Sequence, residues 1–287
     1  MIVCQNLPPL REQIKIWRDN NKKIAFVPTM GNLHAGHLSL VELAQQNADQ
    51  VVVSIYVNPL QFSPDEDFSS YPRTMQEDLE KLEALNVDLV FTPDSSLIYP
   101  QGDRESSFIE MPLLTHIVEG EFRPHFFRGV ATVVLKLFNM VQPDIAVFGE
   151  KDYQQLLIIK QMVADLQLPI EIIGGETTRE ADGLAMSSRN NYLTDDEREK
   201  SQLLSQSLMQ FRQEVEQGGE IKQAQQTCIE NLNNHDFLVD YITLRETSRL
   251  AEVSQQDIQP GLELILLAAI KIGKTRLIDN VKFTVES

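Results

Sequence analysis

The chain has 287 residues, of which 42% are hydrophobic and 23% charged, so a disordered polymer and a fibrous repeat are both excluded. Its 25 basic and 42 acidic residues give a net charge of −17, which argues against nucleic acid or an anionic membrane as partner. The two cysteines form no disulfide framework or metal pair, and the longest apolar run, 264–270, is too short to span a bilayer. We therefore expect a cytoplasmic protein.

The first part of the chain alternates short apolar runs with helical patterns. β-Branched and aromatic residues bounded by Pro, Gly, Asn or Asp predict strands at 24–27, 51–57, 89–91, 145–148 and 170–173. Apolar residues at helical spacing predict helices at 38–48, 75–86, 131–141 and 153–166. Strands that are apolar throughout suit a parallel sheet covered on both faces. Residues 1–177 are thus predicted to be of the α/β class, with a doubly wound, Rossmann-like parallel sheet.

The pattern changes at residue 178. Thr194 can cap a charged helix that runs to residue 216, Gly218-Gly219 interrupts it, and a second helix is predicted at 220–232. Strands are predicted at 237–244, 262–270 and 276–278. Residues 178–287 are therefore predicted to form a second, smaller α+β domain.

A histidine pair stands directly after the first of these predicted strands, in P-T-M-G-N-L-H-A-G-H at 28–37. The turn that leaves this strand of a doubly wound sheet lies at the carboxyl edge, where ligands bind. His34 and His37 would share the first turn of a helix, beside its unpaired N–H groups and the positive end of its dipole. There they can donate to phosphate oxygens, although the sequence does not fix their tautomers. A lone histidine at such a place is more often a cap or a surface residue, and the pair favours phosphate binding.

This segment resembles the H-x-G-H signature of the nucleotidyltransferase superfamily, and with further blocks it resembles the pantothenate synthetase family. Those blocks are 54–62 (S-I-Y-V-N-P-L-Q-F), 71–74 (Y-P-R-T), 149–156 (G-E-K-D-Y-Q-Q-L) and 182–190 (D-G-L-A-M-S-S-R-N), and 276–280 (R-L-I-D-N) also fits. The resemblance implies an AMP-forming ligase. Pantoate attacks the α-phosphate of ATP, pyrophosphate leaves, and β-alanine attacks the enzyme-bound pantoyl adenylate to give pantothenate and AMP.

The resemblance implies catalytic roles for His34, His37, Lys151, Ser187, Ser188 and Arg189. Lys151 would extend from the sheet edge toward the phosphates, although alone it would be interpreted as a solvated lysine. Two serines and an arginine can grip a polyphosphate, and a polar turn between domains is the alternative. Asp152 would accept from a ribose hydroxyl, or cap the helix that follows. The implied ATP-binding residues are Met30, Gly31, Asn32, Leu33, His34, Ala35, Gly36, His37, Gly149, Glu150, Lys151, Asp152, Thr178, Met186, Ser187, Ser188 and Arg189.

The implied pantoate-binding residues are Asn58, Gln61 and Gln155. Neutral amides can orient the carboxylate and hydroxyls of pantoate without repelling the nucleophile, and they discriminate against analogues that lack those hydroxyls. Without the resemblance, an amide beside Pro59 would be interpreted as part of a turn. The domain 178–287 would act as a lid over the ATP site.

The chain departs from the family's usual R-P-G-H-F-x-G-V at 123–130, where His125 replaces the glycine and Phe126 the histidine. No role of that histidine is transferred to His125. We expect Mg²⁺ with ATP, held mainly by phosphate oxygens, and no organic prosthetic group. A homodimer is implied by the family. The alternatives are a nucleotidyltransferase that acts on a phosphate and a catalytically silent nucleotide-binding module.

Overall fold

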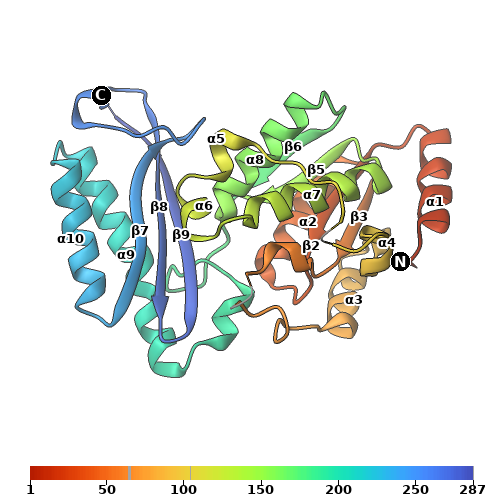
Figure 1. The fold of residues 1–287 in the computed structure, drawn as a ribbon, viewed down its shortest axis with the longest axis horizontal. Helices are drawn as coiled ribbons and strands as arrows, with labels where there is room; N and C mark the ends of the chain where they lie inside the picture. The colour runs from red at the N-terminus through yellow and green to blue at the C-terminus, as the bar shows by residue number, and fades with distance from the viewer. Residues whose placement is uncertain (64–65, 104, 287) are drawn as a thin grey trace. The chain divides into compact units, whose positions relative to one another are not determined.

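The computed structural model describes residues 1–63, 66–103 and 105–286, and in it the chain divides into two compact units (Figure 1). The first unit comprises Met1–Glu150 and Gln155–Glu176, and the second comprises Lys151–Gln154 and Thr177–Ser287. The sequence pattern predicts a single boundary after residue 177, whereas in the structure Lys151–Gln154 also belong to the second unit.

The first unit is built on a six-stranded parallel sheet with the order β1-β4-β3-β2-β5-β6. Its strands are β1 (Ile2–Cys4), β2 (Ile24–Thr29), β3 (Gln50–Ile55), β4 (Leu89–Phe91), β5 (Ile145–Gly149) and β6 (Glu171–Gly175). The chain runs outward from β2 through β3 to β4 and then returns to β5 on the other side of β2. A doubly wound sheet binds its ligands beside such a reversal of strand order. The predicted fold class of this part is confirmed.

Helices cover both faces of this sheet (Figure 1). One face packs against α2 (Ala35–Asn47) and α3 (Met75–Ala84), and the other against α1 (Leu7–Asp19), α7 (Phe126–Val141) and α8 (Tyr153–Asp165). Phe26 belongs to one apolar cluster and its neighbours Ala25 and Val27 to the other, as the alternation of side chains along a strand requires. Burial on both faces explains why these strands are apolar throughout. The shorter helices are η1 (Pro59–Gln61), α4 (Ser95–Ile98), α5 (Pro112–Thr115) and α6 (Glu119–Phe122).

The first elements of the chain, β1 and α1, were not predicted. β1 is too short to show a pattern, and Pro8 and Pro9 weaken the helical signal of α1, although the first turn of a helix tolerates proline. Its buried residues Leu10, Ile14 and Trp17 form one stripe on the helix.

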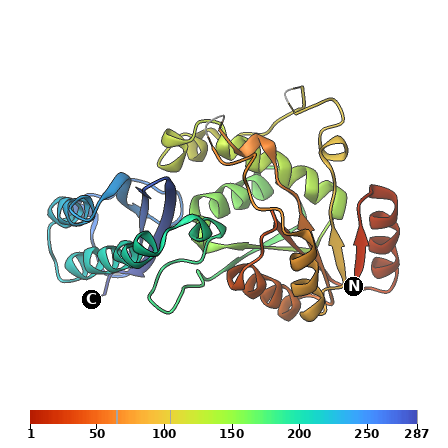
Figure 2. The ribbon, with the colours of Figure 1, turned by 90° about the horizontal axis from the view of Figure 1, so that it is seen from below.

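The second unit packs two helices, α9 (Asp195–Glu216) and α10 (Ile221–Asn233), side by side against an antiparallel sheet (Figure 2). The strands β7 (Phe237–Glu246), β8 (Glu263–Ile272) and β9 (Thr275–Thr284) are neighbours in that order. Thr194 caps α9 in a reciprocal pair with Glu197, with N···O distances of 2.9 and 3.3 Å. The predicted α+β class is confirmed. None of the described helices combines the length and the apolar character needed to cross a membrane.

Strand β9 extends well past its predicted end at residue 278. Asp279 and Asn280 interrupt the apolar pattern, so the sequence indicated the end of a strand. In the structure both residues are buried and lie within the β8–β9 ladder, because polar partners in the same unit satisfy them.

Candidate active site

The turn between β2 and α2 carries Met30-Gly31-Asn32-Leu33 before the histidine pair. Gly31 and Asn32 have φ angles of 81° and 51°, in the left-handed region that glycine and asparagine tolerate best. A Cβ atom on Gly31 would lie 3.0 Å from both Asp78 Oδ2 and Ile55 Cγ2. Both the conformation and the packing therefore require glycine at position 31.

A buried carboxylate from α3 holds this turn in place. Asp78 accepts hydrogen bonds from the backbone N–H groups of Asn32 and Leu33, at 2.9 and 2.7 Å, and from the Thr74 hydroxyl at 3.1 Å. Lys81 donates to the Leu33 carbonyl at 2.8 Å. No sequence motif singled out Asp78. Its signal was an acidic residue one helical turn before the buried Leu82, on the face of α3 that should be apolar.

The two histidines are oriented by backbone donors. His34 is the N-cap of α2, and its Nδ1 accepts the N–H of Gly36 at 3.2 Å. Nδ1 of His37 accepts the N–H of His34 at 3.4 Å, and the ring centroids lie 4.1 Å apart. A ring nitrogen that accepts from an N–H group carries no proton, so each neutral imidazole carries its proton on Nε2. These hydrogen bonds select the tautomers that the sequence left open.

The predicted pantoate-binding amides follow β3. Asn58 is buried, and its Nδ2 donates to Gln61 Oε1 and to the Gly129 carbonyl, each at 3.2 Å. Gln61 Nε2 donates to Met30 Sδ at 2.9 Å. The first unit therefore brings Asn58 and Gln61 together with the turn that follows β2. Gln155 belongs to the same unit and lies in the first turn of α8.

The departure from the family pattern at 125–126 has a clear geometry. His125 has a φ of 73°, which explains why the family usually has glycine at this position. The ring of Phe126 stacks against Arg123, with the guanidinium carbon 3.6 Å from the ring centroid. Arg123 donates to the Gln61 carbonyl at 3.1 Å and pairs with Glu66 at 2.7 and 2.6 Å. Phe126 thus stacks on an arginine that is bonded to the backbone of Gln61.

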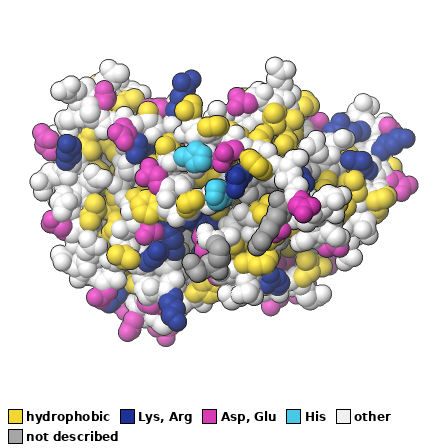
Figure 3. All heavy atoms as spheres, in the orientation of Figure 1, with side chains coloured by type: hydrophobic (Ala, Val, Ile, Leu, Met, Phe, Trp, Pro, Cys, Tyr) yellow, Lys and Arg dark blue, Asp and Glu magenta, His cyan; other side chains and the backbone are white. Residues whose placement is uncertain are grey.

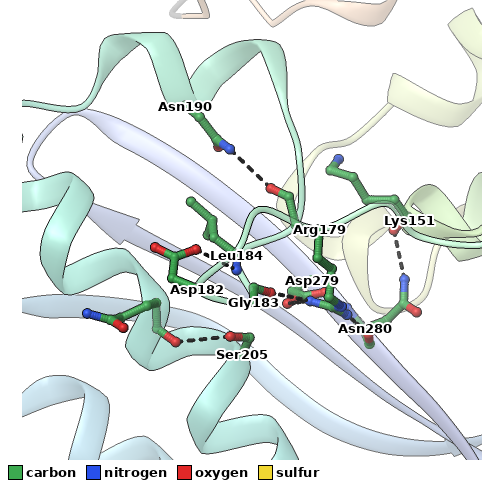
Figure 4. Close-up of polar contacts among 11 residues, drawn as sticks. Lys151, Arg179, Asp182, Gly183, Leu184, Asn190, Ser205, Asp279 and Asn280 are labelled. Carbon is green, nitrogen blue, oxygen red and sulfur yellow. Dashed lines mark hydrogen bonds and ion pairs between the residues drawn. The ribbon is translucent and has the colours of Figure 1, made fainter. Parts of the chain in front are cut away.

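In the second unit, Lys151 is held through its backbone. Asn280 Nδ2 donates to the Lys151 carbonyl at 2.8 Å (Figure 4). The Lys151 ammonium lies 3.4 Å from Asp152 Oδ2, so the two charges of the E-K-D run are paired. Because the side chain of Asp152 is about half exposed in this unit, the ion pair is a weak constraint on the lysine.

An ion pair with a buried carboxylate anchors the segment that precedes the two serines (Figure 4). Arg179 contacts both carboxylate oxygens of Asp279, at 2.7 and 2.9 Å, and donates to the carbonyls of Gly183 and Asn280 at 2.9 and 3.0 Å. Asp279 is only 2% exposed, and a buried carboxylate needs such a partner. The sequence analysis did not assign Arg179 or Asp279, although Asp279 stands in the R-L-I-D-N block.

The serine-rich segment is itself ordered by local hydrogen bonds. Ser187 Oγ accepts the N–H of Arg189 at 3.2 Å at the start of η3 (Ser188–Tyr192), and Met186 N–H donates to the Thr178 carbonyl at 3.0 Å. Asp182 pairs with Arg198 of α9, and the hydrogen bond from this guanidinium lowers the pKa of Asp182.

The predicted ATP-binding residues divide between the two units. The first unit holds Met30, Gly31, Asn32, Leu33, His34, Ala35, Gly36, His37, Gly149 and Glu150, and the second holds Lys151, Asp152, Thr178, Met186, Ser187, Ser188 and Arg189.

Fold and site together define a doubly wound α/β protein with an H-x-G-H turn at the carboxyl edge of its parallel sheet, a combination that resembles the nucleotidyltransferase superfamily. Comparison with known sequences identifies the family within this class. The profile described as pantoate-beta-alanine ligase matches residues 2–282. A pantothenate synthetase of Shewanella sediminis (strain HAW-EB3) is 48% identical over 284 residues, which cover 99% of this chain and 100% of that protein. One of Aliivibrio fischeri (strain ATCC 700601 / ES114) is 48% identical over 282 residues, covering 98% and 96%.

Solved structures agree with the sequence comparison. Pantothenate synthetase from Thermus thermophilus has a TM-score of 0.90 and 41% identity, with 100% of both chains covered. Pantoate-beta-alanine ligase from Francisella tularensis, complexed with beta-gamma ATP and beta-alanine, has a TM-score of 0.79 and 34% identity, with 98% and 97% covered. The chain therefore belongs to the pantoate–β-alanine ligase family, whose members are AMP-forming ligases.

Proposed function

We propose that this chain condenses pantoate with β-alanine through an enzyme-bound pantoyl adenylate, consuming ATP and releasing pyrophosphate and AMP. The observation that carries the proposal is the turn after β2, where backbone donors hold both histidine rings with Nδ1 as acceptor and Nε2 as donor. This turn lies at the carboxyl edge of the sheet beside the reversal of strand order.

In the first step a carboxylate oxygen of pantoate bonds to the α-phosphorus of ATP, and the bond from that phosphorus to the pyrophosphate oxygen breaks. His34 and His37 donate from Nε2 to oxygens of the α- and β-phosphates. Lys151, Ser187, Ser188 and Arg189 bind the polyphosphate and neutralise the charge that develops on pyrophosphate. Such a transfer depends on positioning and charge stabilisation rather than on a covalent enzyme intermediate.

The substrates are oriented by neutral groups and by backbone. Gln61 and Gln155 bind the carboxylate and hydroxyls of pantoate, and Asp152 accepts from a ribose hydroxyl. Asn58 is 1% exposed and its amide is already bonded to Gln61, the Gly129 carbonyl and the Tyr99 hydroxyl, so it serves the pantoate site by holding Gln61. In the second step the amine of β-alanine attacks the adenylate carbonyl, a C–N bond forms, the C–O bond to AMP breaks, and the amine loses a proton. The second unit acts as a lid over the ATP site, since it supplies the residues that grip the polyphosphate.

Mg²⁺ bound with ATP would neutralise part of the phosphate charge. In the described ranges, 1–63, 66–103 and 105–286, no group of three or more His, Cys, Asp or Glu side chains could hold a metal ion. The described residues thus form no dedicated carboxylate cage, and phosphate oxygens would be the main ligands of the ion. A cytoplasmic location is supported by Cys4 and Cys228, which are both buried and free. A homodimer is proposed from the family resemblance and is tested by light scattering.

The test is to incubate the protein with pantoate, ATP, Mg²⁺ and β-alanine and to follow pantothenate, AMP and pyrophosphate. We expect the three products in equal amounts, and one equivalent of pyrophosphate without AMP when β-alanine is omitted. Transfer of a nucleotide to a phosphate acceptor without AMP would support the nucleotidyltransferase alternative. ATP binding without any turnover would support the silent module. Either result would overturn the proposal.

A further inference from the structure

Tyr99, the C-cap residue that follows α4, begins a series of hydrogen bonds that ends at Gln61. Its phenol is buried and donates to Asn58 Oδ1 at 2.7 Å. Nδ2 of Asn58 then donates to Gln61 Oε1 at 3.2 Å. All three residues belong to the first unit, and both Tyr99 and Asn58 are almost inaccessible, at 3% and 1% exposed.

Two backbone groups, one that can only accept and one that can only donate, determine the direction of these hydrogen bonds. The Gly129 carbonyl can only accept, and it receives Asn58 Nδ2 at 3.2 Å. The Leu60 N–H can only donate, and it points to Asn58 Oδ1 at 3.4 Å. These contacts assign Oδ1 of Asn58 as the acceptor and Nδ2 as the donor in the intact protein. Because the contact with Leu60 is long, the phenol of Tyr99 is the strong donor that holds Oδ1.

The direction of the Asn58 amide determines that of Gln61. With Oε1 of Gln61 occupied by Asn58, its Nε2 faces the other way and donates to Met30 Sδ at 2.9 Å. A thioether is a weak acceptor, so an oxygen atom of a ligand can replace it at a gain in free energy. Gln61 is thus oriented to offer an N–H donor, and the complementary group is a carboxylate or hydroxyl oxygen.

We propose that Tyr99 is a positioning residue that determines specificity, because it holds Gln61 with its amide nitrogen directed at an oxygen of pantoate. The inference rests on the proposed function, in which Gln61 binds pantoate. If the amide of Gln61 turned, its carbonyl would face a pantoate oxygen, and both the repulsion and the lost hydrogen bond would weaken binding. A pantoate oxygen that is buried without its donor should lower the affinity for pantoate roughly tenfold to a hundredfold.

The experiment is the substitution Tyr99→Phe, which removes only the phenolic hydroxyl. The aromatic ring is kept, and with it the contact with Lys136, whose ammonium lies 5.0 Å from the ring centroid. We expect the KM for pantoate to rise roughly tenfold to a hundredfold, with the KM for ATP changed less than about threefold. Tyr56→Phe is the matched control. Tyr56 is also buried and its phenol is also bonded, but to Ser95 Oγ at 3.1 Å, so its loss should leave the KM for pantoate unchanged.

A second measurement does not depend on how much of the variant is folded. It is the ratio of kcat/KM for pantoate to that for an analogue lacking one hydroxyl. The ratio should fall in Tyr99→Phe, since a Gln61 amide free to turn no longer requires an oxygen acceptor. An unchanged ratio, or equal increases in KM for pantoate and ATP, would overturn the inference. Failure of the proposed function is distinguishable, because the unsubstituted protein would then form no pantothenate, or Gln61→Ala would leave the KM for pantoate unaltered.

Discussion

His34 uses its two ring nitrogens for different purposes. Nδ1 caps α2 by accepting the N–H of Gly36, and we propose that Nε2 donates to a phosphate of ATP. The cap contributes to stability of the ground state, whereas the phosphate contact gains strength in the transition state. The two roles can be separated by a side chain that retains one of them.

Asparagine in place of His34 is expected to separate these roles. Its short amide can still cap the helix, so the free energy of unfolding should stay within about 0.5 kcal/mol of the original. It has no donor where Nε2 lies, so formation of pantoyl adenylate should fall about 10²–10³-fold. The measurements are urea unfolding and pyrophosphate release without β-alanine.

His34→Ala is the comparison, because it removes both groups. It should lose the same activity and a further ~1 kcal/mol of stability. A near-normal rate in His34→Asn would remove His34 from the phosphate site, and full stability of His34→Ala would remove its role as a cap.

At the scale of elements, strand β9 and helix α9 together hold the segment that leads to Ser187. Asp279 of β9 binds Arg179, and Arg198 of α9 binds Asp182. The second contact is partly exposed, so the charge of Asp182 remains accessible to titration. Its lowered pKa makes the contribution of this pair dependent on pH.

The direction of that dependence follows from the lowered pKa. The carboxylate is favoured in the folded state, so its contribution is present above the pKa of an unfolded aspartate, near ~3.9, and is lost as the pH falls through the folded value. Asp182→Asn should therefore cost about 0.5–1 kcal/mol at pH 7 and less at pH 3. Circular dichroism or hydrogen exchange of α9 measures this, since the fluorescence of Trp17 reports on the first unit.

Arg198→Gln provides the partner control for this pair. It should remove a similar amount of stability at pH 7 and likewise less in acid. If Asp182→Asn lowered the free energy of unfolding equally at both pH values, the ion pair with Arg198 would not be the cause of the loss.

At the scale of the whole molecule, the net charge of −17 opposes the approach of ATP. Acidic and basic side chains are interspersed on the face drawn in Figure 3. Among the residues described on that face, the acidic side chains do not gather into a single patch. The proposed site must attract phosphate through a few groups at contact distance against this field. Salt screens the repulsion between ATP and distant carboxylates more strongly than the attraction between phosphate and positive groups at contact distance.

We therefore expect the KM for ATP to fall when the ionic strength rises from about 10 to 100 mM, as the Debye length shortens from roughly 30 to 10 Å. Steady-state assays at a fixed concentration of free Mg²⁺ measure this effect. Pantoate, a monoanion, should respond less than ATP and serves as the internal comparison. A rise in the KM for ATP over this range would show that the local positive groups dominate even at long distance.

Local pattern was sufficient to predict most of the fold. The strands from β2 to β6 and the four longer helices between them, α2, α3, α7 and α8, were evident because burial imposes a periodicity on adjacent residues. The wide apolar runs indicated a sheet covered on both faces. The H-x-G-H turn was likewise a local motif, and its place after β2 follows from chain order. The family blocks extended this information to the reaction.

The tertiary structure alone decided how the polar groups are used. The partners of Asp78, Tyr99 and Asp279 lie 46, 41 and 100 positions away in the chain, and no local pattern relates residues at such distances. The direction of the Gln61 amide likewise depends on Tyr99 and Gly129, which are far from it in the chain. Sequence determines which groups are present and which segments are buried, whereas the direction of a buried hydrogen bond is set only when distant segments fold together.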